Sequence, residues 1–212
     1  DLNSKAVSMA DASGATAALI KNNGNLTITD GTEGKAGKLS FNSTTPSANN
    51  GYACNTISNY GTITIEAGTI ENTTVGGACY ALDNYAGSTA TINGGKLTAE
   101  KTAVRIFNWT NGDAAKATLN VNGGEIYSKD GYAINVNSGN APAVALNITG
   151  GIIPTDDTDY NLAVYVVNKG TAENFTASVT GGTFNGYYAL NGVTSATMAK
   201  GAVSITDGTF EG

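Results

Sequence analysis

Histidine is absent from the 212 residues of this chain, and arginine occurs once, at Arg105. Without histidine the chain cannot form Ser-His or Cys-His nucleophilic pairs, or any histidine-based metal site. Its 2 cysteines are too few for a structural zinc site, which takes four ligands. These absences exclude the commonest types of hydrolase and zinc centre.

Charge is also scarce. Charged residues make up 13% of the chain, about half the usual share, and the net charge is −6. The low charge argues against a disordered chain and against a coiled coil. No cluster of lysines forms a basic stripe, which argues against binding to nucleic acid or to an anionic membrane surface. No apolar run approaches the roughly 18 to 20 residues that span a bilayer, so we expect no membrane insertion.

Glycine, in contrast, is abundant, with 28 residues. A short pattern recurs seven times: an aliphatic residue, two small or polar residues, a glycine, any residue and usually an apolar one. Residues of alternating polarity precede each copy, as in Leu119-Asn-Val121, and this period of two is typical of a half-buried strand that ends at the glycine turn. The copies are 28–31, 65–70, 92–97, 121–126, 148–153, 179–184 and 205–210.

A second strand follows in each repeat, with alanine at one place, an apolar residue next and a polar or aromatic residue after it. Because neighbouring residues of a strand point to opposite sides, one column should face inward and the next outward. Repeats of about 27 residues that cannot bury their own apolar faces predict a stacked β-solenoid of about seven coils, roughly 30 to 35 Å long. The three columns are Ala53, Ala78, Ala103, Ala133, Ala163 and Ala189, then Cys54, Cys79, Val104, Ile134, Val164 and Leu190, then Asn55, Tyr80, Arg105, Asn135, Tyr165 and Asn191.

The repeat resembles known proteins in its turn, most clearly in Thr180-Gly-Gly-Thr-Phe184 and Thr206-Asp-Gly-Thr-Phe210. It is similar to the right-handed parallel β-helix proteins of the pectate-lyase-like superfamily, and above all to the repetitive Gly-Gly-Thr-Phe surface proteins of gut bacteria and their phages. The resemblance implies an all-β, right-handed parallel β-helix. It leaves function open, because this scaffold carries lyases, hydrolases, adhesins and tailspikes.

Residues 1–16 break the repeat, and we expect them to form an N-terminal cap or a partial coil before a β-helix over residues 17–212. The chain starts at Asp1 with no signal-peptide pattern and ends in a copy of the repeat, which we interpret as a piece of a longer protein.

Cys54 and Cys79 fall in the same inward column on neighbouring coils. They are either two buried thiols or a disulfide between coils, since stacked parallel strands hold Cα atoms about 4.8 Å apart, within the disulfide range.

The pairs Asn59-Tyr60, Asn84-Tyr85 and Asn108-Trp109 fall at one place on three successive coils. The rings either stack on each other to order a turn or form a sugar-binding platform beside Arg105 and Asp83, because amphipathic rings can cover sugar faces. The asparagines predict a ladder of amide hydrogen bonds through stacked strands. That ladder would comprise Asn59, Asn84, Asn108, Asn137 and Asn168.

Asp156, Asp157 and Asp159 lie in an enlarged coil, either as a solvated loop or as oxygen ligands for Ca²⁺, without the glycine and distal glutamate of an EF-hand. Enzymes of the superfamily use calcium-binding carboxylates with an arginine or lysine base. Arg105 is the one arginine available, and the nearest plausible acids are Asp83, Asp113 and Asp130. Arg105 is more simply an outward residue of its column. We expect no enzymatic activity and no cofactor.

The sequence therefore predicts a non-catalytic adhesin, stalk or fibre segment that is extracellular or exposed on a cell or virion surface. Two alternatives are a carbohydrate-binding or polysaccharide-degrading β-helix, whose partner would be a polysaccharide or cell-surface glycan, and a self-associating filament subunit.

Overall fold

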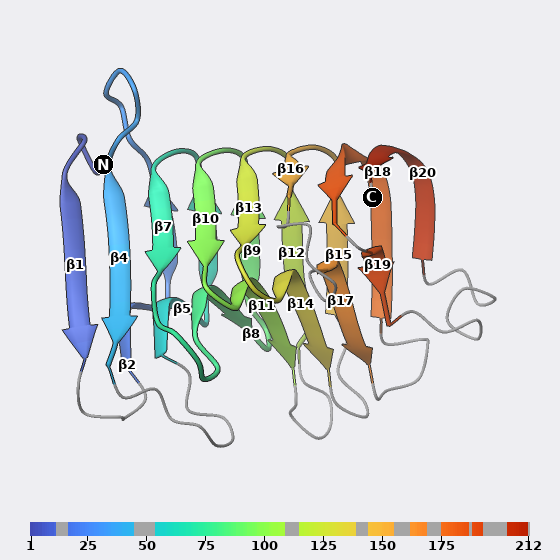
Figure 1. The fold of residues 1–212 in the computed structure, drawn as a ribbon, viewed down its shortest axis with the longest axis horizontal. Helices are drawn as coiled ribbons and strands as arrows, with labels where there is room; N and C mark the ends of the chain where they lie inside the picture. The colour runs from blue at the N-terminus through green and yellow to red at the C-terminus, as the bar shows by residue number, and fades with distance from the viewer. Residues whose placement is uncertain are drawn as a thin grey trace.

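The computed structural model is a parallel β-solenoid, which confirms the predicted fold (Figure 1). It describes residues 1–11, 17–44, 54–108, 115–138, 144–154, 162–168, 175–186, 188–192 and 203–211, and these contain strands and turns but no helix. About five turns have three separate strands each, so the seven predicted coils differ in count alone. Toward the C-terminus the chain continues with longer, merged strands.

Each turn contributes one strand to each of three faces, and every strand lies parallel to its neighbours. The first face consists of β1 (Ala6–Asp11), β4 (Lys38–Ser43), β7 (Thr69–Asn72), β10 (Lys96–Ala99), β13 (Glu125–Ser128) and β16 (Ile152–Ile153). The second consists of β2 (Ala17–Asn22), β5 (Cys54–Asn59), β8 (Tyr80–Tyr85), β11 (Thr102–Asn108), β14 (Tyr132–Ser138), β17 (Leu162–Asn168) and β19 (Tyr188–Asn191). The third consists of β3 (Asn25–Ile28), β6 (Thr62–Ile65), β9 (Thr89–Ile92), β12 (Ala117–Val121) and β15 (Val144–Ile148), while β18 (Phe175–Asn185) and β20 (Val203–Glu211) run from the third face into the first.

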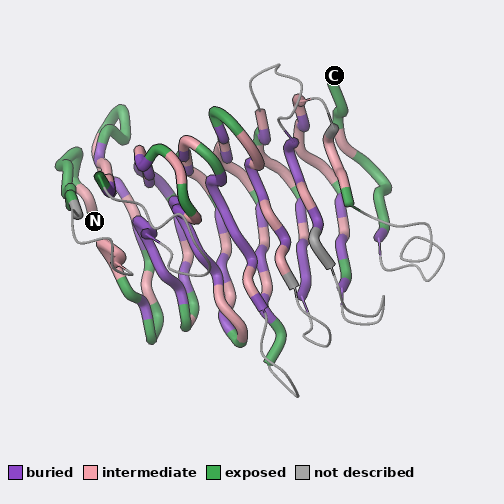
Figure 2. Tube along the Cα trace, turned by 60° about the horizontal axis from the view of Figure 1, so that its bottom comes forward, coloured by how far each residue is buried: buried purple, intermediate pink, exposed green. Residues whose placement is uncertain are grey.

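The core is a set of apolar columns, because in-register stacking places like residues over like. Buried positions follow the strands along the length of the solenoid, whereas exposed ones gather at turns and at both ends (Figure 2). Each fully buried leucine or isoleucine contributes about 1.5–3 kcal/mol to folding. One column on the third face comprises Leu26, Ile63, Ala90, Leu119, Leu146, Ala177 and Val203.

The N-terminal segment supplies the first strand of the first turn. β1 pairs with β4 from Ala6 opposite Lys38 to Asp11 opposite Ser43, although the sequence there lacks the repeat. Val7 and Met9 on this strand are 49% and 36% exposed, since no described strand lies beyond them. The first face therefore begins with an edge strand.

The Gly-Gly turns are explained by two different constraints, which Gly123 and Gly124 illustrate. A Cβ atom on Gly123 would lie 2.4 Å from the carbonyl oxygen of Asn93 in the preceding coil. Gly124 has a φ of +80°, a left-handed conformation that side chains disfavour. The first glycine thus permits close stacking of coils and the second permits the turn.

We predict that Gly123→Ala destabilises the protein by about 1–3 kcal/mol, because backbone of the neighbouring coil must move away from the new methyl group. The matched control is Gly24→Ala, where a Cβ meets nothing within 4 Å. That change should be neutral, or stabilise by up to about 1 kcal/mol by restricting the unfolded chain. Urea unfolding of both variants measures the difference, and equal midpoints would contradict the stacking explanation.

Candidate functional site

The second face carries Asp83, Tyr85 and Arg105 of the predicted platform, with Tyr60 directly after β5, and its register differs from the predicted one. The repeat pattern places Arg105 beside Tyr80, but the structure pairs Thr102 with Tyr80 and Arg105 with Asp83. The predicted columns are therefore wrong between β8 and β11. Because of this shift Ala81, and not Ala78, is the fully buried alanine that precedes Leu82 as Ala103 precedes Val104.

Arg105 and Asp83 form a buried, bidentate ion pair across adjacent coils. Arg105 Nε lies 2.8 Å from Asp83 Oδ1, and its Nη2 lies 2.5 Å from Oδ2. Asn55 also donates to Asp83 Oδ2 from Nδ2 at 3.1 Å. Asp83 is completely buried and Arg105 is 5% exposed, so both charges have left water and depend on each other.

Aromatic rings enclose the guanidinium. Its Cζ atom lies 4.2 Å from the ring centre of Tyr80 and 4.1 Å from that of Phe107, within the range of cation–π attraction. Burial opposes the charge on Arg105, but the facing Asp83 carboxylate outweighs it and raises the pKa of the guanidinium above its ordinary value. Burial also disfavours the charged form of the Tyr80 phenol, and for a phenol this raises the pKa. Arg105 is therefore a fixed cation.

This geometry bears on catalysis, because a proton-abstracting base must have a free lone pair or a lowered pKa. Arg105 has neither, and its partner Asp83 already accepts hydrogen bonds from Arg105 and Asn55. The other buried carboxylate among the described residues, Asp30, accepts from the hydroxyl of Thr32 at 2.6 Å and the amide of Gly37 at 2.6 Å. The Thr32 hydroxyl and the surrounding amides lower the pKa of Asp30 to about 2, so these hydrogen bonds hold it as a carboxylate.

The remaining candidate acids are placed as follows. Asp130 is exposed and forms an ion pair with Lys101. Asp113 lies outside the described residues, as do the three candidate calcium ligands Asp156, Asp157 and Asp159. The described residues hold no group of three or more His, Cys, Asp or Glu side chains that could bind a metal ion.

The aromatic column exists, but with a different third member. Tyr60 and Tyr85 stack with ring centres 4.2 Å apart and planes 10° apart. Phe107, which pairs with Tyr85 in the register, meets its ring edge-on at 5.8 Å, whereas Trp109 lies outside the described residues. Tyr85 therefore has ring neighbours on both sides, whereas Tyr60, the last ring of the stack, has Tyr85 on one side alone and is 42% exposed.

The asparagine ladder is shorter than predicted. Inside the solenoid Asn22 donates to Asn59, and Asn59 to Asn84, each from Nδ2 to Oδ1 at 2.7 Å. Asn84 then donates to the backbone oxygen of Thr118. The shifted register pairs Asn84 with Ile106, so Asn108 does not continue the column.

Further along, Asn108 pairs with Ser138 and Ser138 with Asn168, whereas Asn137 pairs with Phe107. Asn137 therefore falls outside the predicted ladder as well. The ladder ends where the register of β11 against β8 differs from the predicted register by three residues.

Cys54 and Cys79 are joined by a disulfide, with their Cα atoms 4.6 Å apart. They pack with Phe41 in a small apolar cluster beside the main core. The sequence left open two buried thiols or a disulfide between coils, and the structure contains the disulfide.

A groove that the repeat pattern did not indicate lies where β1, β2 and β5 meet. Its volume is about 380 Å³. Lys21 projects its Nζ atom over the Tyr60 ring, 5.1 Å from the ring centre. No repeat motif points to Lys21, because the first coil departs from the repeat. The described lining residues are Met9, Ala17, Ala18, Lys21, Ser58 and Tyr60.

Within the described residues no helix is long and apolar enough to cross a membrane. Comparison of the chain with protein-family models, with curated proteins and with solved structures finds no match.

Proposed function

We propose that this chain is a non-catalytic, rigid β-solenoid segment that acts as a stalk, fibre or adhesin on an extracellular, cell or virion surface. The observation that carries the proposal is a single column of paired residues along the described length of the first face. It runs through eight strands without a break in pairing. Its members are Ala6, Lys38, Thr69, Lys96, Glu125, Ile152, Thr183 and Thr209.

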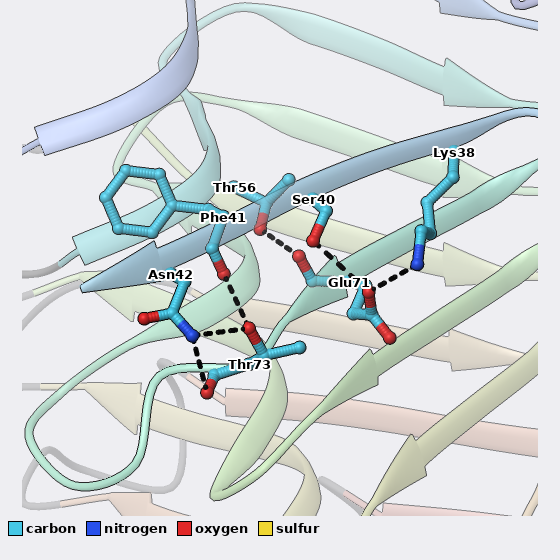
Figure 3. A network of polar contacts seen from close by, with 7 residues as sticks. All are labelled: Lys38, Ser40, Phe41, Asn42, Thr56, Glu71 and Thr73. Carbon is cyan, nitrogen blue, oxygen red and sulfur yellow. Dashed lines mark hydrogen bonds and ion pairs between the residues drawn. The ribbon is translucent and has the colours of Figure 1, made fainter. Parts of the chain in front are cut away.

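Polar side chains strengthen the contacts between coils on the outside of the same face (Figure 3). Glu71 on β7 binds Lys38 Nζ at 2.9 Å and accepts a hydrogen bond from the Ser40 hydroxyl of β4. Asn42 donates to the hydroxyl of Thr73 at 2.8 Å. Each exposed contact is worth little alone, but together they restrain how adjacent coils slide or bend.

A second polar series crosses the coils on the third face. Asn147 donates to Asn120 Oδ1 at 2.9 Å, and Asn120 donates to the Thr91 hydroxyl at 3.3 Å. Just beyond, Asn122 donates to Asn93 and Asn93 to Glu66, each at 2.9 Å. Cross-coil restraint on more than one face is what a rigid spacer requires.

An extracellular or surface location is supported by the disulfide, because such links persist in oxidising compartments. A relation to the Gly-Gly-Thr-Phe surface proteins is supported by the turn motif at 180–184 and 206–210. The absence of catalysis is supported by the Arg105–Asp83 pair, because the two side chains are buried and already bonded to each other.

Carbohydrate binding is the second candidate function, and the groove beside Tyr60 is the observation that favours it.

Self-association into a filament is supported by exposed apolar residues on both outermost strands. Ile205 and Phe210 of β20 are 43% and 46% exposed. Sedimentation that rises with concentration would support the filament, and a constant small particle would count against it.

The rigid-spacer proposal predicts one narrow end-to-end distance. Ala6 and Thr209 are exposed members of the same column, seven strand steps apart. With about 4.8 Å per step, spin labels on Ala6→Cys and Thr209→Cys should be roughly 34 Å apart, plus the label arms. Pulsed electron–electron double resonance measures the distribution of distances between the two labels. The same labelled protein in urea provides the broad distribution of an unfolded chain for comparison.

A broad distribution in buffer would overturn the spacer role. Release of reducing or unsaturated sugars from a polysaccharide panel would overturn the absence of catalysis.

A further inference from the structure

We propose that the groove beside Tyr60 binds a terminal sugar unit that carries a carboxylate. The inference rests on the second candidate function, carbohydrate binding, and is independent of the rigid-spacer role. It depends on three features of the groove: one ring face not stacked on another ring, one cation without an acidic partner, and one hydroxyl held ready to donate.

The ring face belongs to Tyr60, the last ring of the stack. Tyr85 covers one side of Tyr60, and Phe107 contacts Tyr85 edge-on rather than Tyr60. Tyr60 is 42% exposed and also lines the groove. An amphipathic ring of this kind packs against the C–H face of a sugar while its hydroxyl stays in water.

The cation is Lys21. The other two lysines on the described strands, Lys38 and Lys96, have a carboxylate within 3 Å. No ion pair to Lys21 occurs among the described residues, and its ammonium group stands over the Tyr60 ring instead. A flexible lysine can move from the ring to an incoming anion, which makes a carboxylate the natural complement.

The hydroxyl is that of Ser58, a residue only 6% exposed. Asn55 donates from Nδ2 to Ser58 Oγ at 2.9 Å, so the serine proton remains available for an oxygen atom in the groove. Ala17, Ala18 and Met9 supply apolar wall for C–H or methyl groups.

The volume of about 380 Å³ lies at the small end of ligand sites and suits a terminal unit better than a long chain. One small sugar ring can offer all three complementary groups. Its carboxylate would meet Lys21, its C–H face Tyr60 and a hydroxyl oxygen Ser58.

The test is isothermal titration calorimetry with 3′-sialyllactose and with lactose, which lacks only the acidic sugar. We expect binding of the first to be several-fold tighter and to weaken as salt is added, because the ion pair is exposed. Methyl glucuronide against methyl glucoside repeats the comparison and tells a uronate from a sialic-acid type of ligand.

Lys21→Met should remove the preference for the acidic sugar, Lys21→Arg should retain most of it, and Tyr60→Leu should weaken both ligands. Lys116→Met is the matched control, an exposed lysine away from the groove. Thermal unfolding of each variant checks that it is folded.

Equal binding of the acidic and the neutral sugar in both pairs would overturn the inference and leave carbohydrate binding standing. Absence of binding by all four sugars would overturn both, while the label distance decides the spacer role separately. An equal loss in Lys21→Met and Lys116→Met would also overturn the assignment of the groove.

Discussion

Asp83→Leu is expected to destabilise the protein by about 3–5 kcal/mol, because it leaves the Arg105 guanidinium buried without its counter-ion. Arg105→Met should cost a similar amount by leaving the carboxylate alone. The double variant, Asp83→Leu with Arg105→Met, should recover most of the loss, since apolar side chains of similar volume often replace a buried pair without penalty.

Urea unfolding of the four proteins gives a double-mutant cycle, whose coupling energy isolates the interaction. Lys101→Met is the control, because Lys101 pairs with Asp130 in solvent and should cost less than about 1 kcal/mol. A coupling energy near zero between Asp83 and Arg105 would show that the two charges do not depend on each other.

The second large effect concerns the disulfide. Cys54→Ala with Cys79→Ala should reduce the free energy of unfolding by about 3–4 kcal/mol, because the link closes a loop of 25 residues and restricts the unfolded chain. The measurement is urea unfolding of the wild type and the double variant, each with and without reductant.

Reductant should lower the stability of the wild type to that of the double variant and leave the variant unchanged. Thiol-reactive label should fail to modify the denatured wild type until it is reduced. Labelling of both cysteines without reductant would contradict the disulfide in the native protein.

The local features of this protein were predictable because they are repeated in every coil. The period-two alternation before each glycine, as at Leu119 and Val121, predicts a strand without knowledge of its neighbours. The stacking of Cys54 over Cys79 was also predictable, since the flanking residues align on both coils with a constant step. The Tyr60–Tyr85 stack follows from that same step.

The prediction was wrong where the step between coils changes. Aligning Ala78 with Ala103 preserves the apparent pattern, yet the structure moves β11 by three residues and brings Arg105 to Asp83. A strand register depends on turn lengths and on contacts across coils, neither of which a short motif contains. The shifted register places Arg105 beside Asp83, so the buried carboxylate has a counter-ion.

The sequence by itself thus determined the solenoid, its columns and its glycine turns, because stacking requires one local pattern to recur. Only the tertiary structure decided which charges are buried together and which ring face and cation share a groove. Lys21 and Tyr60 are separated by a whole coil in sequence and meet across two strands in space. Contacts of this kind arise from the stacking of coils, and so no local pattern predicts them.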